Sequence, residues 1–386
     1  RPNQHAAIIP KVWGTNISYK HIIYADMKSL VTRYHRGLCT LGLKKGDKVL
    51  FLVKPGIDFL ALAYAVMAEG AIPVFIDPGI EKKYLFEALE DIKADVFIGT
   101  QKAHLLRIIK KRLFKKIRFH VIADEWGVTS GPTLTVLRRF ASVPEVPSKY
   151  NEVAMIAFTS GATGTPKGVV FTQKMIAEQL DVFKNIFGIE SGKIDMPLLP
   201  IFSIYQLANG VTSVFPPIDP SAPLDLDPSI ITKIIKDLSV SYSFGSPTLW
   251  RKIAEYSVRI HMTLPTIKKV FMAGAAVPTS TISLVKEVVP DGDVFTPYGA
   301  TEALPVTMAG AKELEQNSNV AARSGEQGVF VGKSIPQVKL KIIAEVDGPI
   351  DSIDQAQFLS PYEIGEIIVQ GATVSPQYLN RSDADL

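Results

Sequence analysis

The chain has 386 residues, of which 47% are hydrophobic and 21% charged, a balance typical of a folded globular protein and not of a disordered one. Its 42 basic and 38 acidic residues leave a net charge of +4, an excess too small to predict nucleic-acid binding. A chain of this length exceeds the size at which one hydrophobic core keeps growing, so two or three subdomains are expected.

Cysteine usage and the apolar runs predict a cytoplasmic location. The single cysteine, Cys39, excludes an intramolecular disulfide framework, and its helical spacing in HRGLCTLGL predicts a buried core thiol and not a nucleophile. The opening residues, RPNQHAAIIP, lack the long apolar run of a signal peptide. The longest apolar block, FLALAYAVM at 59–67, is too short to cross a bilayer.

Strand-like and helix-like runs alternate through the first 150 residues. KVLFLV (48–53) reads as a buried strand, the run at 55–70 as a helix ended by glycine, and IPVFID (72–77) as the next strand. A helix at 81–92 and a strand at 95–99 continue the pattern. Such βαβ units predict a parallel sheet covered by helices.

The segment 102–118, KAHLLRIIKKRLFKKIR, contains eight lysines and arginines and no acidic residue. Its leucines and isoleucines recur at helical spacing, so a basic helix is expected here. One interpretation is a solvated basic face above a docked apolar stripe, and the other is peripheral contact with an anionic membrane surface. Nucleic acid is not expected as a partner, because no aromatic interleaving accompanies the charge.

A second α/β series follows, with strands predicted at 152–158, 239–245 and 267–274 and a helix at about 174–187. From about residue 328 the sequence pattern changes to short runs in which apolar and polar residues alternate: VFVGKSI (329–335), VKLKIIAEV (338–346) and GEIIVQG (365–371). These predict a small antiparallel sheet or barrel. The expected organisation is therefore α/β units at about 1–150 and 151–325, and a β-barrel subdomain at about 326–386.

The most informative stretch is FTSGATGTPKGVVFTQ, residues 158–173. Counted from Gly161, the lysine of a Walker A loop falls on Lys167, but Pro166 replaces the second glycine and Gly168 replaces the magnesium-binding hydroxyl. The following GVVF is strand-like, whereas a Walker A loop opens a helix. Glycine amides, hydroxyls and one ammonium group still favour phosphate binding, and the alternative is an ordinary flexible hairpin tip.

Four motifs in order resemble the adenylate-forming superfamily of acyl-CoA synthetases, fatty-acyl-AMP ligases, peptide-synthetase adenylation domains and luciferases. They are TSGATGTPKG (159–168), MAGAAVP (272–278), TPYGATE (296–302) and GEIIVQGATVSPQYLNR (365–381). The resemblance implies the large N-terminal AMP-binding domain of that group, with two helix-covered α/β sheets layered αβαβα and a small β-barrel. In relatives a ribose-binding aspartate, a hinge and a lid with a catalytic lysine follow the pair equivalent to Asn380–Arg381. The lid domain is therefore expected to be absent from this chain, and adenylation without the lid lysine is expected to be slow or absent.

The resemblance also implies roles for individual residues in the use of ATP and Mg²⁺. Glu302 would hold the metal, Thr301 would contact the α-phosphate, and Lys167 would act on the β- and γ-phosphates, so these three form the expected catalytic set. The family turn usually has proline where this chain has Ala276, a mild change in a backbone contact. The remaining nucleotide-binding residues implied are Thr159, Ser160, Gly161, Ala162, Thr163, Gly164 and Thr165 in the loop, Gly274, Ala275 and Ala276 against the adenine, and Tyr298 and Gly299 beside them.

The acyl site is expected at PLLPIFSIYQLANG (197–210) and FGSPTLW (244–250). Many relatives carry an aromatic–histidine pair in the first segment, where this chain has Phe202 and no histidine. Apolar lining by Phe202, Phe244, Gly245 and Pro247 suits a lipid-like acid. No acidic residue is clearly placed to bind an α-amino group, and no Ser-His-Asp arrangement or metal-ligand spacing of the six histidines offers a rival chemistry.

Several stretches resemble one branch, the β-lactone synthetases of bacterial head-to-head hydrocarbon biosynthesis: 75–80, 200–223, 244–249 and 296–306. Those enzymes adenylate a 2-alkyl-3-hydroxy acid, whose own hydroxyl then expels AMP, so coenzyme A is not needed. Assembly with other enzymes of that biosynthesis is a further implied partnership. One alternative is a long-chain acyl-CoA synthetase, which would use CoA, or a fatty-acyl-AMP ligase. Another is a non-catalytic module that binds nucleotide and acyl groups.

Overall fold

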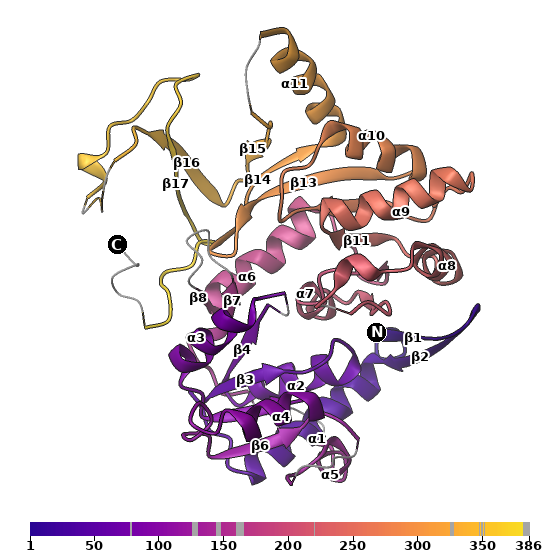
Figure 1. Ribbon diagram of the computed structural model, residues 1–386, viewed down its shortest axis with the longest axis vertical. Coiled ribbons are helices and arrows are strands. Elements are labelled where there is room, and N and C mark those ends of the chain that lie inside the picture. The colour runs from indigo at the N-terminus through magenta and orange to yellow at the C-terminus, as the bar shows by residue number, and fades with distance from the viewer. Residues whose placement is uncertain are drawn as a thin grey trace.

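The structure is a computed structural model that describes residues 1–77, 79–125, 130–143, 148–159, 166–219, 221–324, 328–346, 348, 350 and 352–380. Two large sheets and their helices organise the chain (Figure 1). The first sheet lies in the lower part of that view, and the second sheet runs from β13 and β14 in the upper part down to β1 and β2 at the lower right. The mixed α/β layering expected from the sequence is confirmed.

The first sheet has six strands in the order β6-β5-β3-β4-β7-β8, parallel except for the antiparallel pair β7–β8. Side chains alternate between its two faces, so Phe51 points into the core shared with the second sheet while Leu50 packs under α3 and α4. The bounds are β3 Lys48–Leu52, β4 Ile72–Ile76, β5 Val96–Gly99, β6 Phe119–Ile122, β7 Val153–Thr159, β8 Lys167–Thr172, α1 Tyr24–Thr40, α2 Ile57–Ala68, α3 Lys82–Ile92, α4 Gln101–Ile109 and α5 Leu134–Leu137.

The second sheet has nine strands in the order β15-β14-β13-β12-β11-β9-β10-β1-β2. Its centre, from β13 to β1, is parallel, and both margins are antiparallel. The bounds are β1 His5–Trp13, β2 Asn16–Ile23, β9 Ile194–Asp195, β10 Thr212–Val214, β11 Tyr242–Gly245, β12 Lys269–Met272, β13 Asp293–Ala300, β14 Ala303–Gly310 and β15 Lys333–Ser334, with α8 Pro228–Leu238, α9 Pro247–Arg259, α10 Thr279–Val288 and α11 Ala311–Ser324. Helices α8, α9 and α10 bury apolar side chains against one face of this sheet.

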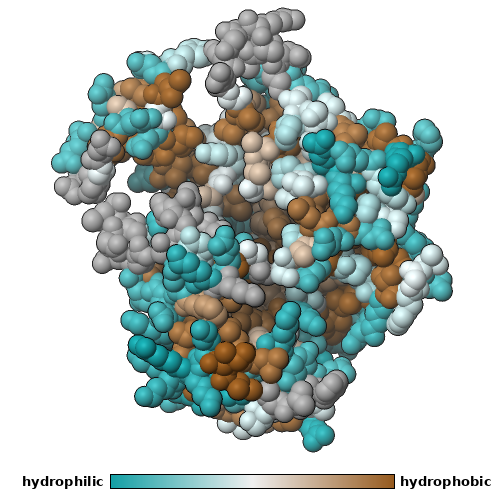
Figure 2. Space-filling view, viewed as in Figure 1, coloured by the Kyte–Doolittle hydropathy of each residue, from teal (hydrophilic) through white to brown (hydrophobic). Residues whose placement is uncertain are grey.

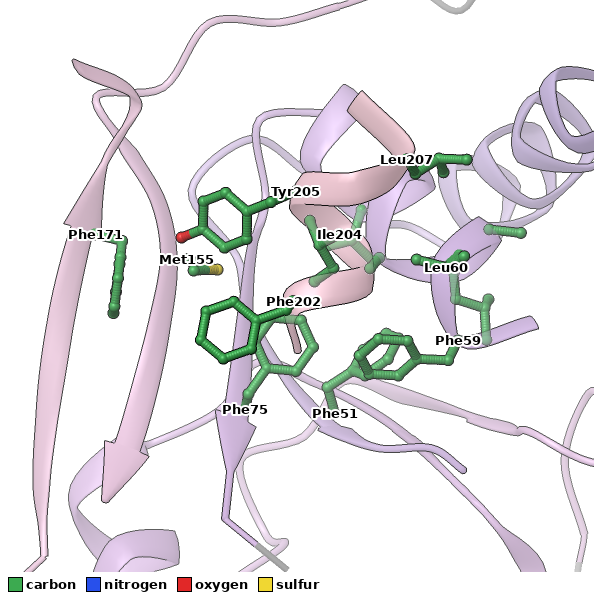
Figure 3. Close-up of a cluster of buried hydrophobic side chains, with 14 of the residues drawn as sticks. Phe51, Phe59, Leu60, Phe75, Met155, Phe171, Phe202, Ile204, Tyr205 and Leu207 are labelled. Carbon is green, nitrogen blue, oxygen red and sulfur yellow. The ribbon is translucent and has the colours of Figure 1, made fainter. Parts of the chain in front are cut away.

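Between the sheets lies a shared apolar layer to which α1, α2, α6 (Gln173–Asp181) and α7 (Phe202–Ala208) contribute. Figure 3 shows Phe202, Ile204 and Tyr205 of α7 facing aromatic side chains of the first sheet, among them Phe51 and Phe75. The helix predicted at 174–187 is α6 continued by a π-helical turn at Val182–Ile186. Because this layer belongs to both sheets, the two α/β units form one continuous core.

The two sheets do not divide at residue 150 as the sequence predicted, because each sheet takes strands from the other side of that position. Strands β1 and β2, at the start of the chain, pair into the second sheet through β10, and β7 and β8 complete the first sheet. The hairpin β7–β8 stays in the first sheet because β8 follows β7 closely in the chain and pairs antiparallel with it.

The basic segment is shorter as a helix than expected. Helix α4 ends at Ile109, and residues 110–116 form turns. The chain turns there because Phe114 is buried against Phe97 of the first sheet, with ring centroids 5.2 Å apart. A straight continuation of α4 would carry this ring along the surface. The expected helix at 102–118 is therefore corrected to Gln101–Ile109 followed by a docked turn.

The C-terminal strands also differ from expectation. Strand β16 (Val338–Ile343) pairs antiparallel with β17 (Glu366–Gly371), and within the described residues this sheet has two strands and does not close into a barrel. The run 329–335 provides only β15, which joins the second sheet. Gly332 interrupts the run directly before β15, since its φ of 90° is left-handed and a Cβ there would lie 2.1 Å from the Met308 carbonyl oxygen.

No helix in the described part of the chain is long and apolar enough to cross a membrane.

Candidate active site

The stretch that resembles a phosphate-binding motif connects β7 to β8. Thr159 ends β7 and pairs with Lys167, the first residue of β8. The strand after the lysine excludes a Walker A loop, as the sequence predicts. The other loop residues, Ser160, Gly161, Ala162, Thr163, Gly164 and Thr165, lie outside the described residues.

Gly168 has a steric reason to depart from the Walker A pattern. A Cβ at this position would lie 2.6 Å from the Phe158 ring and 3.1 Å from the Leu379 Cβ. Its carbonyl oxygen accepts a 2.7 Å hydrogen bond from the Leu379 N–H. The absence of a side chain therefore lets residue 379 approach β8 closely.

The presumed adenine-contacting residues gather at the carboxyl ends of adjacent parallel strands. Phe271 of β12 is opposite Phe295 of β13, so the turn that follows β12 and Tyr298, near the end of β13, lie at the same edge of the sheet. The turn 274–276 is exposed, and Tyr298 is 40% exposed although it lies on a strand. Ligands of open parallel sheets bind at this edge, so an exposed ring beside a bare backbone turn is suited to stacking a planar base.

Two further residues of the TPYGATE motif form the turn between β13 and β14. Thr301 and Glu302 are half-buried there. Gly299 precedes them, and a Cβ on it would lie 2.3 Å from the Ala303 carbonyl oxygen. The tight turn thus fixes the direction of the Glu302 side chain relative to the sheet edge.

Glu302 and Lys167 meet at a third side chain, Tyr378. The Tyr378 hydroxyl donates a 2.7 Å hydrogen bond to Glu302 Oε1, and Lys167 Nζ lies 5.0 Å from the centre of the Tyr378 ring. Two residues predicted from separate motifs, 135 positions apart in the chain, are thereby brought to one place. Their oxygen and ammonium groups can contact a metal ion and a phosphate chain at the same site.

Sequence reasoning missed Tyr378 as a site residue. It falls in the quoted stretch 365–381, but one tyrosine near a proline gives no periodic or charge signal. The backbone of the segment that holds Tyr378 bridges to both sheets: Tyr378 pairs with Val169 of β8, and Val374 pairs with Ala303 of β14. We call residues 374–379 the cross-strap.

The four residues expected at the acyl site lie together, at the carboxyl end of β11 and on α7. The Phe202 and Phe244 ring centroids are 3.9 Å apart, and both rings are buried. Gly245 ends β11, and Pro247 is the first residue of α9, whose N-cap Ser246 accepts a hydrogen bond from the Leu249 N–H. The serine–proline pair in FGSPT is therefore a helix start, and the acyl region is an aromatic layer filled by its own side chains.

Apart from this site, Cys39 takes part in a polar cluster beside a cavity of about 520 Å³. Atoms of His35, Cys39 and Glu69 lie within 4.8 Å of one another, which is compatible with metal ligation. However, Lys149 forms an ion pair with Glu69, and burial together with a hydrogen bond to Glu69 raises the pKa of the half-buried Cys39 thiol to about 12. The cluster is thus a hydrogen-bond network that joins α1 to the end of α2, and the raised pKa of Cys39 disfavours the thiolate, which is the nucleophilic form. The thiol is half-buried among polar groups and does not lie in the apolar core, which corrects the buried core thiol that the helical spacing predicted.

Comparison with known proteins places the chain in a class. The family model described as AMP-binding enzyme matches residues 2–379, so the chain belongs to the AMP-binding enzyme family. It is accordingly an ATP-dependent, AMP-forming ligase.

The similar proteins narrow this class. The chain is 35% identical to an olefin beta-lactone synthetase of Stenotrophomonas maltophilia (strain K279a), over 100% of this chain and 70% of that protein. It is 32% identical to an olefin beta-lactone synthetase of Xanthomonas campestris pv. campestris, over 100% of this chain and 69% of that one. A solved long-chain-fatty-acid-CoA ligase from Archaeoglobus fulgidus has the same fold, with a TM-score of 0.78, 17% identity, and coverage of 99% of this chain and 74% of that one.

Proposed function

We propose that this chain activates a long-chain 2-alkyl-3-hydroxy acid as its acyl adenylate and then closes the β-lactone. The observation that carries the activation step is the convergence of Lys167 and Glu302 on Tyr378. The 35% identity to an olefin beta-lactone synthetase over the whole chain supports the second step.

In the first step a carboxylate oxygen of the substrate bonds to the α-phosphorus of ATP, and pyrophosphate leaves with the electrons of the broken phosphorus–oxygen bond. The reactants are both anionic, so their charge must be neutralised before they approach. Lys167 is assigned to the leaving phosphates, Thr301 donates its hydroxyl to the α-phosphate, and Tyr298 orients the adenine. Glu302 offers carboxylate oxygens, the donors that Mg²⁺ prefers, and Mg²⁺ held there would offset phosphate charge.

In the second step the 3-hydroxyl oxygen bonds to the acyl carbon, AMP leaves, and the hydroxyl proton is released. The nucleophile is part of the substrate, so the enzyme supplies orientation and exclusion of water. Phe202 and Phe244 are assigned to the alkyl chain, since their layer is apolar and buried.

The test incubates the full-length protein, lid domain included, with Mg·ATP and a synthetic 2-alkyl-3-hydroxy acid, with and without CoA, and identifies products by NMR. We expect β-lactone and AMP in both mixtures. The matched 2-alkyl acid without the 3-hydroxyl should stop at the adenylate. A thioester formed only with CoA would overturn the lactone step, and ATP binding without pyrophosphate release would favour a non-catalytic module.

A long-chain acyl-CoA synthetase is the second candidate. The observation in its favour is that the layer around Phe202 is largely aromatic and that its Tyr205 hydroxyl already donates a 2.8 Å hydrogen bond to Gln179 Oε1, so this donor is not available to select a 3-hydroxyl. The incubation with CoA in the same experiment distinguishes this acyl-CoA synthetase activity from β-lactone formation. Assembly with other enzymes of hydrocarbon biosynthesis stays a prediction.

We also propose that α4 and the turn after it contact an anionic membrane surface. Leu105, Ile108 and Ile109 are 53%, 47% and 74% exposed on α4, and Figure 2 shows a hydrophobic patch over this helix with hydrophilic surface around it. The eight basic residues of 102–118 have no acidic residue among them. Each cation near an anionic bilayer contributes about 1 kcal/mol, and the exposed aliphatic side chains add insertion into the interface.

Vesicle sedimentation tests this contact. Binding should be strong to vesicles with anionic lipid, weak to neutral vesicles, and reduced about tenfold by Ile109→Ser. Ile260→Ser is the matched control, because Ile260 is 40% exposed elsewhere. Equal loss in both variants, or no preference for anionic vesicles, would refute the proposal.

A further inference from the structure

The cross-strap holds Tyr378 in place through backbone bonds to both halves of the site. The Leu379 N–H donates to the Gly168 carbonyl at 2.7 Å, and the Val170 N–H donates to the Gln377 carbonyl at 3.2 Å. On the other side, the Ser375 N–H donates to the Glu302 carbonyl at 2.6 Å. The ring of Tyr378 is therefore fixed by the main chain before any ligand binds.

Tyr378 lies between two opposite charges that would otherwise attract each other. No ion pair joins Lys167 and Glu302 in the described part of the chain. Instead the ammonium lies over the ring face and the carboxylate accepts from the hydroxyl. Lysine and glutamate side chains are among those that lose the most rotamer entropy when they are ordered, so a fixed contact for each lowers the entropic cost of ordering them on binding.

We propose that Tyr378 is a positioning residue that holds Glu302 for the metal and Lys167 for the phosphates while keeping the two from pairing. This inference rests on the proposed function, in which Glu302 holds Mg²⁺. Tyr378 takes no proton and contacts no reacting atom. It acts through the two charged groups that its hydroxyl and its ring orient.

Two substitutions separate the hydroxyl from the ring. Tyr378→Phe removes the bond to Glu302 and keeps the ring under Lys167, so the affinity for Mn²⁺·ATP should fall about tenfold, as expected for loss of one hydrogen bond to a charged group. The affinity for metal-free ATP should be unchanged. Tyr378→Leu also removes the cation–π contact, so metal-free ATP should then bind several-fold more weakly as well. Tyr362→Phe is the matched control, because Tyr362 is 99% exposed.

The experiment uses the 386-residue protein, titration calorimetry of ATP with EDTA or with Mn²⁺, and the Mn²⁺ electron paramagnetic resonance signal. Glu302→Gln is measured in parallel. If Glu302→Gln and Tyr378→Phe both lose Mn²⁺-dependent affinity while Tyr362→Phe does not, the inference is supported. If Glu302→Gln loses it and Tyr378→Phe does not, the positioning role is overturned and the proposed function survives. If Glu302→Gln has no effect, the metal assignment itself is wrong.

Discussion

Replacing Asp195 with asparagine should stabilise the protein and remove part of its pH dependence. Asp195 lies on β9 in the middle of the nine-stranded sheet and is 1% exposed. Burial raises the pKa of its carboxyl from 3.8 to about 8, although the nearby Gln206 amide and Met196 N–H lower it. Neither of these groups reaches a well-formed hydrogen bond with the carboxyl oxygens. The folded protein therefore carries a neutral acid in the sheet at pH 7.

The magnitude follows from the two pKa values. Below about pH 4 the folded and unfolded states both hold the proton. Between about pH 4 and pH 8 only the unfolded state releases it, so the free energy of unfolding falls by about 1.4 kcal/mol per pH unit. The full loss is about 6 kcal/mol, reached above pH 8. Asparagine resembles the neutral acid in shape and does not titrate.

Urea unfolding at pH 5 and pH 7.5 measures this effect. The gain in stability of Asp195→Asn over the parent should grow by about 3 kcal/mol between these pH values. Asp291→Asn serves as the control, since the Asp291 side chain is 62% exposed. A variant whose stability follows the same pH dependence as the parent would refute the reasoning, because the carboxyl would then ionise in the folded state as easily as in water.

Three other changes test the packing and the polar groups of the structure. Gly168→Ala should weaken ATP binding at least tenfold, because the added Cβ would push the Phe158 ring away. Gly310→Ala is the control and should be tolerated, since the nearest atom to an added Cβ there is 3.8 Å away. Equal affinities of the two variants for ATP by calorimetry would contradict this prediction. Phe202→Ala should lower the free energy of unfolding in urea by about 3 to 5 kcal/mol, because it removes a buried ring, and a loss below 1 kcal/mol would mean that the aromatic layer is loosely packed. Cys39 should react with iodoacetamide at pH 8 at least about 100-fold more slowly than glutathione does, and its rate should rise about tenfold with each pH unit up to about pH 12. A rate at pH 8 equal to that of glutathione would show that the pKa of the thiol is ordinary.

The sequence predicted the elements that depend on local pattern. Strands β3, β4 and β5 read as continuous apolar runs because helices cover both faces of their sheet. The four family motifs located the segment between β7 and β8, the exposed turn after β12 and the Glu302 turn. These features need only residues that are close in the chain or shared by relatives.

What the sequence did not predict depends on contacts between distant residues. The exchange of β1 and β2 into the second sheet is set by pairing with β10, about 200 positions away. The end of α4 is set by burial of Phe114 against another element, and the interruption of the 329–335 run before β15 by the approach of Gly332 to the Met308 carbonyl. Tyr378 became visible as a site residue only when the cross-strap was seen beside β8 and the Glu302 turn.

The cross-strap also has a consequence for the order of folding. The Ser375 hydroxyl bonds to the Val170 carbonyl, 205 positions away in the sequence, and long-range closures of this kind cost entropy before they form stabilising contacts. During synthesis both sheets can be largely in place before residues 374–379 leave the ribosome. The two halves of the nucleotide site are then present but not joined, so the capacity to use ATP arises late, after the core that supports it.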